Sequence, residues 1–71
     1  MQYAIVLHPA EEGGYWSEVP ALPGCASQGE TLDDALENTR AAIRDWLAYL
    51  RDRGEAVPSS SDLVLTIDVA A

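Results

Sequence analysis

Residues 19–36 read VPALPGCASQGETLDDAL, and this stretch decides how the chain folds. It holds two prolines, two glycines and the only cysteine, directly ahead of an acidic segment. Prolines and glycines at this density end a strand and reverse the chain sharply. The segment CASQG, residues 25–29, then leaves room only for a short strand. The stretch therefore predicts a strand end, a tight turn, a short strand and the start of a helix.

Thr31 is the expected N-cap of that helix. Its hydroxyl can accept a hydrogen bond from the backbone N–H of Asp34, which completes a capping-box pattern. Gly54 and Pro58 supply the stop signals at the other end. Between them, apolar residues recur at three- and four-residue steps and form one broad stripe, with Thr39 within it: Leu32, Leu36, Ile43, Trp46 and Leu50. We therefore predict a long helix over residues 32–53.

Three further segments have the alternation of strands. Residues 2–7 (QYAIVL) and 15–19 (YWSEV) flank the turn HPAEEGG, and residues 63–70 (LVLTIDVA) alternate after the helix. The element order is βββαβ, and a right-handed crossover places the last strand beside the first. The predicted fold is α+β, a four-stranded mixed sheet of order 3-2-1-4 with the helix on one face. The expected buried residues are Leu36, Ile43, Trp46, Leu50, Leu65 and Ile67.

The chain of 71 residues predicts a single domain, residues 1–71, with a formal net charge of −8. All four arginines lie within residues 40–53, whereas residues 1–39 hold seven acids and neither lysine nor arginine. Such a surface repels phosphate backbones and suits either a basic partner or plain solubility. No signal-like start and no membrane-length apolar run is present, so we expect a soluble cytoplasmic protein with no direct nucleic-acid or membrane binding.

One helix covers only one face of the predicted sheet. An apolar patch on the other face is typical of an interface, and a domain this small gains stability from a second subunit. We therefore expect a homodimer or higher homo-oligomer, with an interface formed by Ala4, Val6, Trp16 and Val64.

Catalysis is not expected. His8 and Cys25 are the only candidates for a nucleophilic pair, and one histidine with one cysteine is too little for a zinc site. The βββαβ order is that of the ribonuclease H core, but its two-metal chemistry needs a carboxylate in the first strand. QYAIVL has none. We therefore predict no enzyme activity, no metal and no cofactor.

Residues 14–43 (GYWSEVPALPGCASQGETLDDALENTRAAI), followed by GEAVPSS at 54–60, resemble the HicB family, the antitoxins of HicA–HicB toxin–antitoxin pairs. The resemblance implies a partial ribonuclease H fold without nuclease activity. It also implies binding and neutralisation of HicA, a small basic ribonuclease that cleaves mRNA. The family's proline–glycine–cysteine turn then serves as architecture, through Pro20, Pro23, Gly24, Cys25, Gly29 and Thr31.

Two features depart from the family pattern. The chain ends at Ala71, so no C-terminal DNA-binding domain is expected, and Ala21 stands where the family often has an acid. The alternative function is an orphan oligomeric domain that binds another protein or a small ligand. The candidate contacts for a basic partner are Glu11, Glu12, Glu18, Glu30, Asp33 and Asp34, whose alternative roles are solvated charge and helix capping.

Overall fold

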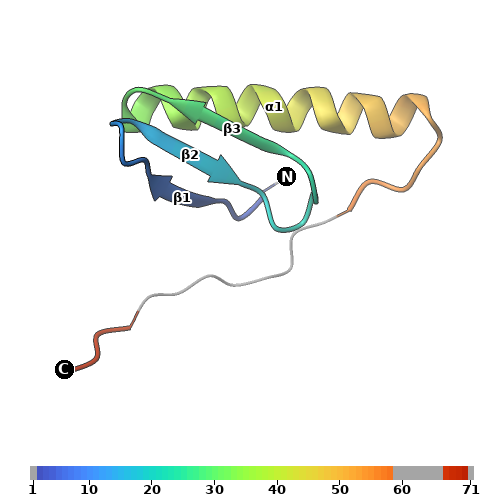
Figure 1. Ribbon diagram of the computed structural model, residues 1–71. Coiled ribbons are helices and arrows are strands. Elements are labelled where there is room, and N and C mark those ends of the chain that lie inside the picture. Colours follow the sequence, from blue (N-terminus) through green and yellow to red (C-terminus); the bar gives the residue numbers. More distant parts are fainter. Residues whose placement is uncertain (1, 59–66, 71) are drawn as a thin grey trace.

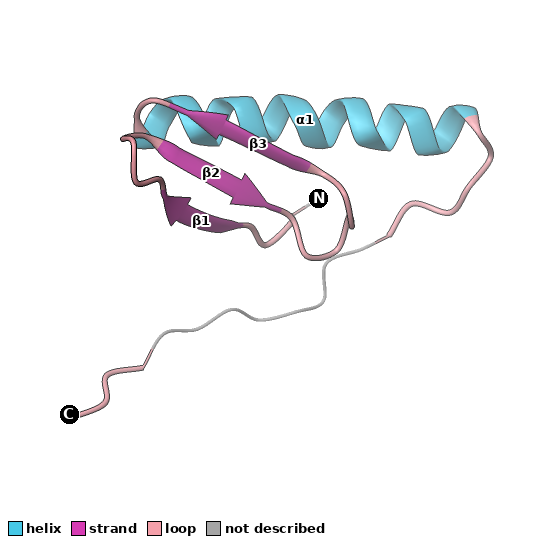
Figure 2. Ribbon diagram, viewed as in Figure 1, coloured by secondary structure: helices cyan, strands magenta, loops and turns pink. Residues whose placement is uncertain are grey.

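The computed structural model describes residues 2–58 and 67–70. Its elements, in chain order, are β1 (Val6–Pro9), β2 (Tyr15–Glu18), β3 (Ala26–Gly29) and α1 (Leu32–Asp52). The strands form an antiparallel sheet of order β1-β2-β3, and α1 lies alongside β3 (Figures 1 and 2). The α+β class, the meander and the single long helix are confirmed.

The sheet register explains why β1 begins later than predicted. Val6 pairs with Glu18 and His8 with Trp16, so residues before Val6 would have to pair beyond β2. There the chain reaches Pro20, which has no backbone N–H to donate, and turns away. Residues 2–5 are therefore not part of the described strand, although Tyr3 and Ile5 still pack against the core.

The helix begins as the sequence predicts. The backbone N–H of Asp34 donates to Thr31 Oγ1 over 3.0 Å, and Thr31 has the extended conformation of an N-cap. At the other end Arg53 is the C-cap and Gly54 follows with φ +72°. The helix end therefore lies within one residue of the predicted one.

The core is smaller than the apolar stripe indicates. Its buried apolar residues are Val19, Leu22, Cys25, Ala35 and Leu47. The buried residues of α1 are Ala35, Thr39 and Leu47, and they mark the line along which the helix faces the core. Leu36, Ile43, Trp46 and Leu50 are therefore only half-buried. The prediction that these four residues are buried therefore holds only in part, although Ile43, Trp46 and Leu50 do pack against the core.

A buried polar pair links the helix to the sheet. Ser17 on β2 is 0% exposed and Thr39 on α1 is 1% exposed. Their hydroxyl oxygens are 2.6 Å apart, and Thr39 Oγ1 also donates to the Ala35 carbonyl over 2.6 Å. Because a hydroxyl has one proton, Thr39 accepts from Ser17, whose Oγ also has the Ser27 carbonyl 3.4 Å away as a longer, competing acceptor. The inner face of β2 is thus fixed over one turn of α1.

The predicted last strand lies largely outside the described residues, which exclude 59–66. Residues 67–70 have no regular secondary structure. Ile67 is 83% exposed, so its predicted burial was wrong: the described sheet contributes no strand beside residues 67–70 to cover it. Leu65 falls outside the described residues, and the order 3-2-1-4 stays a prediction.

Candidate partner-binding site

The β1–β2 turn presents two carboxylates at its tip. Ala10 N–H donates to the Gly14 carbonyl and Gly13 N–H to the Ala10 carbonyl, which closes a tight turn with both glycines at positive φ. A Cβ on Gly14 would lie 2.7 Å from the Gly29 carbonyl oxygen. Because glycine has no Cβ, the turn can pack directly against the end of β3. Glu11 and Glu12 are exposed beyond it.

The junction from β3 to α1 places further carboxylates at the same end. A Cβ on Gly29 would lie 2.3 Å from the Ala35 backbone nitrogen, so the first turn of the helix sits directly on β3. Glu30 precedes the cap, and Asp33 and Asp34 occupy the first turn, all exposed. There the helix dipole stabilises negative charge, so these acids also serve the helix.

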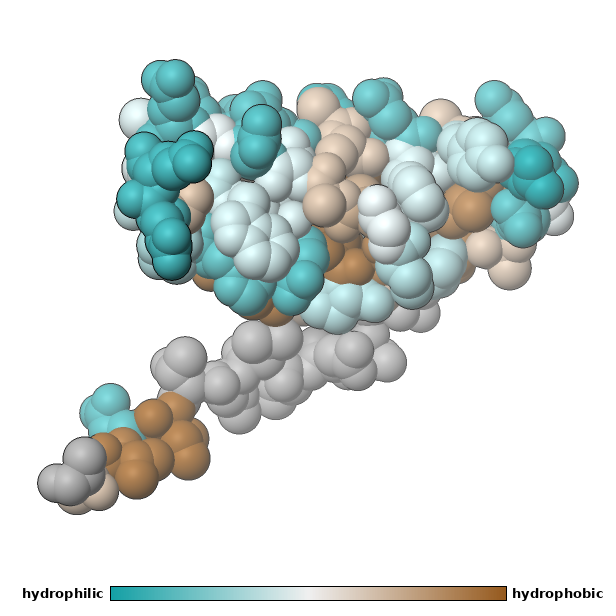
Figure 3. Space-filling view, viewed as in Figure 1, coloured by the Kyte–Doolittle hydropathy of each residue, from teal (hydrophilic) through white to brown (hydrophobic). Residues whose placement is uncertain are grey.

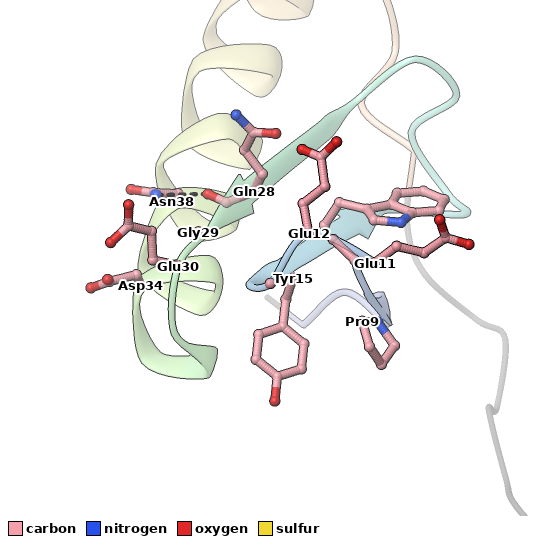
Figure 4. Close-up of a pocket in the computed structure, with 12 residues that line it drawn as sticks. Pro9, Glu11, Glu12, Tyr15, Gln28, Gly29, Glu30, Asp34 and Asn38 are labelled. Carbon is pink, nitrogen blue, oxygen red and sulfur yellow. Dashed lines mark hydrogen bonds between the residues drawn. The ribbon is translucent and has the colours of Figure 1, made fainter.

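An open hollow of about 880 Å³ lies between the two turns. Figure 4 shows Glu11 and Glu12 on one side of it and Glu30 and Asp34 on the other. Tyr15, Trp16 and Asn38 also line it, and Asn38 Nδ2 donates to the Gln28 carbonyl over 2.8 Å. Neither lysine nor arginine lines this hollow. It can therefore attract a cationic group of a partner, in a manner sensitive to salt.

Of the six candidate acids, Glu18 lies apart from the others. It is on the outer face of the sheet, the face turned away from α1, where its Oε1 is 3.3 Å from His8 Nε2. The His8 ring stacks on Trp16 with centroids 3.9 Å apart and planes at 15°. The other five acids, by contrast, gather at the hairpin end. In Figure 3 hydrophilic side chains gather at that end of the visible face.

Sequence reasoning missed His8 as part of the outer face. The hairpin register could have predicted this position, because a turn centred on residues 11–13 pairs His8 with Trp16. Of the predicted oligomer contacts, Val6 and Trp16 lie on this outer face. Ala4 precedes β1 and is half-buried, and Val64 is outside the described residues.

The proline–glycine stretch is a compact loop that closes one end of the core. The Val19 N–H donates to the Cys25 carbonyl. The Leu22 N–H donates to the Val19 carbonyl, and the Cys25 N–H donates to the Leu22 carbonyl. Leu22 is fully buried and Gly24 has φ +91° beneath the Trp46 ring. Pro20 and Pro23 are exposed on the same loop. These three bonds close the loop on itself.

Cys25 and His8 are not brought together. Cys25 is buried between the sheet and α1, whereas His8 lies on the outer face. Burial raises the pKa of the Cys25 thiol, because the thiolate would lose its hydration. Such a thiol is a poor nucleophile. Within residues 2–58 and 67–70, no three His, Cys, Asp or Glu side chains converge to hold a metal.

With the geometry in place, comparison with known proteins identifies the class. Residues 3–69 match the model of a family described as the HicB-like antitoxin of bacterial toxin–antitoxin systems. The chain belongs to this family. The resemblance noted from the sequence is confirmed.

Individual relatives agree with the family match. A UPF0150 protein of Synechocystis sp. is 42% identical over 83% of this chain and 81% of its own length. The antitoxin HicB of Escherichia coli K12 is 33% identical over 89% of this chain, but over only 46% of its own. The crystal structure of the N-terminal domain of the Burkholderia pseudomallei antitoxin HicB matches with a TM-score of 0.74 at 40% identity, covering 87% of this chain and 73% of that one.

No helix in the described part of the chain is long and apolar enough to cross a bilayer.

Proposed function

We propose that this protein is an antitoxin that binds and neutralises a small basic toxin of the HicA type, a ribonuclease that cleaves mRNA. Membership of the HicB-like family supports the antitoxin role. The observation that favours a basic partner is the cluster of five exposed carboxylates at the hairpin end: Glu11, Glu12, Glu30, Asp33 and Asp34.

Neutralisation needs no chemistry by the antitoxin. Covering the toxin's basic surface competes with RNA, which is held by the same kind of positive charge. The proposal therefore assigns no catalytic residue, metal or cofactor to this chain. It also places the protein in the cytoplasm, where mRNA is cleaved, and assigns no direct nucleic-acid or membrane binding to residues 1–71, which form one domain.

Two structural expectations belong to the same proposal. A fourth strand beside β1, supplied by the segment that follows the helix, would give the order 3-2-1-4 of a partial ribonuclease H fold. The protein also self-associates as a homodimer or larger homo-oligomer.

One observation favours a second candidate function. The chain spans 81% of the Synechocystis relative, whose name carries no antitoxin role, but under half of the Escherichia coli antitoxin HicB. An orphan domain that binds another protein or a small ligand is therefore the alternative.

Co-expression with a small basic protein, where one is encoded beside this chain's gene, tests the proposal. We expect the toxin alone to arrest growth, and this protein to restore growth and to co-purify with the toxin. Binding measured by interferometry should weaken as salt increases. If neither that protein nor the toxins encoded with the Escherichia coli and Burkholderia antitoxins bind, the orphan function is the correct one.

A further inference from the structure

We infer that the outer face of the sheet around Trp16 is the surface on which the basic toxin docks. We call it the Trp16 face, and it consists of Val6, His8, Trp16, Glu18 and Gln28. This inference rests on the proposed function and adds to it a specific surface and an anchor residue.

The position and environment of Trp16 fit an anchor. Trp16 lies on the central described strand, paired with His8 of β1 and Gln28 of β3, yet its side chain remains 41% exposed. The stack on His8 at 3.9 Å fixes the ring, so binding costs little side-chain entropy. A fixed, exposed tryptophan is the residue type most enriched among binding hot spots. Its face also attracts arginine and lysine.

The charges around the Trp16 face select the kind of partner. Glu18 is on the face, and Glu11 and Glu12 adjoin it at the end where Trp16 lines the hollow. The His8 ring on the same face already contacts Glu18, with Nε2 3.3 Å from Oε1. All four arginines belong to α1 or its C-cap. Ser17 lies on the opposite side of β2 from Trp16, and its hydroxyl contacts Thr39 of α1. The helix therefore covers the face of the sheet opposite the Trp16 face.

This charge distribution disfavours a second copy as the occupant. A two-fold interface through the Trp16 face would enclose the carboxylates of both chains without supplying a lysine or arginine to pair with them, and carboxylates buried without a cationic partner cost binding energy. A basic partner would instead neutralise them. The Trp16 face therefore fits a toxin with a positively charged surface better than another copy of this chain.

Replacing Trp16 in the full chain tests this inference. Trp16→Ala should weaken the affinity for the toxin identified by co-expression roughly thirtyfold, the size of a typical hot spot. The matched control is Tyr49→Ala, which removes a 52%-exposed aromatic ring from α1. It should change the affinity by less than about threefold. Circular dichroism checks that both variants are folded.

A second measurement leaves Trp16 in place. In a Trp46→Phe variant, Trp16 is the single tryptophan, and its emission should shift to the blue when the toxin covers it. Toxin binding with no such shift, together with equal affinities for Trp16→Ala and Tyr49→Ala, would overturn the inference but leave the antitoxin function standing. If Trp16→Ala instead dissociates a dimer and leaves toxin affinity unchanged, a second copy occupies the face. No toxin binding by the wild type would contradict both proposals.

Discussion

Gly29 is the residue on which the contact between β3 and α1 depends. A Cβ there would lie 2.3 Å from the Ala35 nitrogen and 2.7 Å from its Cα, and both are backbone atoms. Gly29→Ala should therefore lower the free energy of unfolding by about 3 kcal/mol, as expected for overpacking that only a backbone shift can relieve. Urea denaturation measures this loss.

Gly54→Ala is the matched control for that substitution. Gly54 has φ +72°, but a Cβ added there would meet no atom within 4 Å. The substitution should cost only about 1 kcal/mol, from the left-handed backbone alone. Equal losses for the two variants would show that the helix can move away from β3.

The Ser17–Thr39 pair makes a second prediction at this scale. Thr39→Val removes the nearer partner of the buried Ser17 hydroxyl, at 2.6 Å, and leaves it the Ser27 carbonyl at 3.4 Å, which should cost about 2 kcal/mol. Adding Ser17→Ala removes the weakly bonded hydroxyl, so the double variant should be less destabilised than the sum of the single variants. Additive losses in thermal unfolding would contradict a direct bond between the two hydroxyls.

Cys25 links stability to pH. Because burial raises the pKa of its thiol above the ordinary value of 9.0, the folded protein keeps the proton where the unfolded chain releases it. Stability is therefore complete below that ordinary value and falls as the pH rises through the window up to the raised pKa. Urea midpoints between about pH 8 and about pH 10 should fall for the wild type and fall less for Cys25→Ala. Equal slopes would contradict the shift.

These residue-scale features differ in how well the sequence predicts them. The role of Thr31 follows from neighbours three residues away, and the structure confirms it. The Ser17–Thr39 bond joins residues 22 positions apart, and no local pattern indicates it. Gly29 belongs to the predicted turn motif, but its close approach to Ala35 depends on how helix and strand pack.

The helix is the element that the sequence predicts best, because its signals are local. The cap, the apolar period and Gly54 all lie within its own length or directly beside it. The start of β1 is not local, because it depends on where β2 ends at Pro20. How deeply a residue of α1 is buried depends on how much of the helix the sheet covers, which the apolar period does not show. The period alone therefore predicts more burial for Leu36 and Ile43 than the structure has.

The helix cap makes the prediction that belongs to this scale. Thr31→Ala removes the acceptor for the Asp34 N–H and should lower the free energy of unfolding by about 1 kcal/mol. Thr31→Asp keeps an acceptor and adds favourable charge at the helix start. It should retain most of the stability in the same denaturation experiment. Equal destabilisation by both substitutions would show that the cap is unimportant.

At the scale of the whole molecule, charge governs how the partner approaches. Glu11→Gln with Glu12→Gln should slow association with the toxin and flatten its dependence on salt, with dissociation little changed, because exposed rim charges act mainly on the association rate. Stopped-flow or interferometry at low and high ionic strength measures both rates.

Asp45→Asn with Asp52→Asn is the matched control, because it removes two exposed acids from the arginine-bearing part of α1. This variant should keep most of the wild-type association rate. If the two double variants behave alike, net charge alone matters, and recognition by the hairpin end is wrong.

The uneven placement of charge along the chain has a mechanical consequence. Residues 37–55 carry four acids and four arginines and so balance, whereas residues 2–36 carry six acids and neither lysine nor arginine. The centre of negative charge is therefore displaced from the helix's C-terminal half toward the strands and the hairpin. In the field of a basic body such a molecule experiences a torque as well as an attraction. It rotates before contact, so that a larger share of collisions begins with the hairpin end facing the partner.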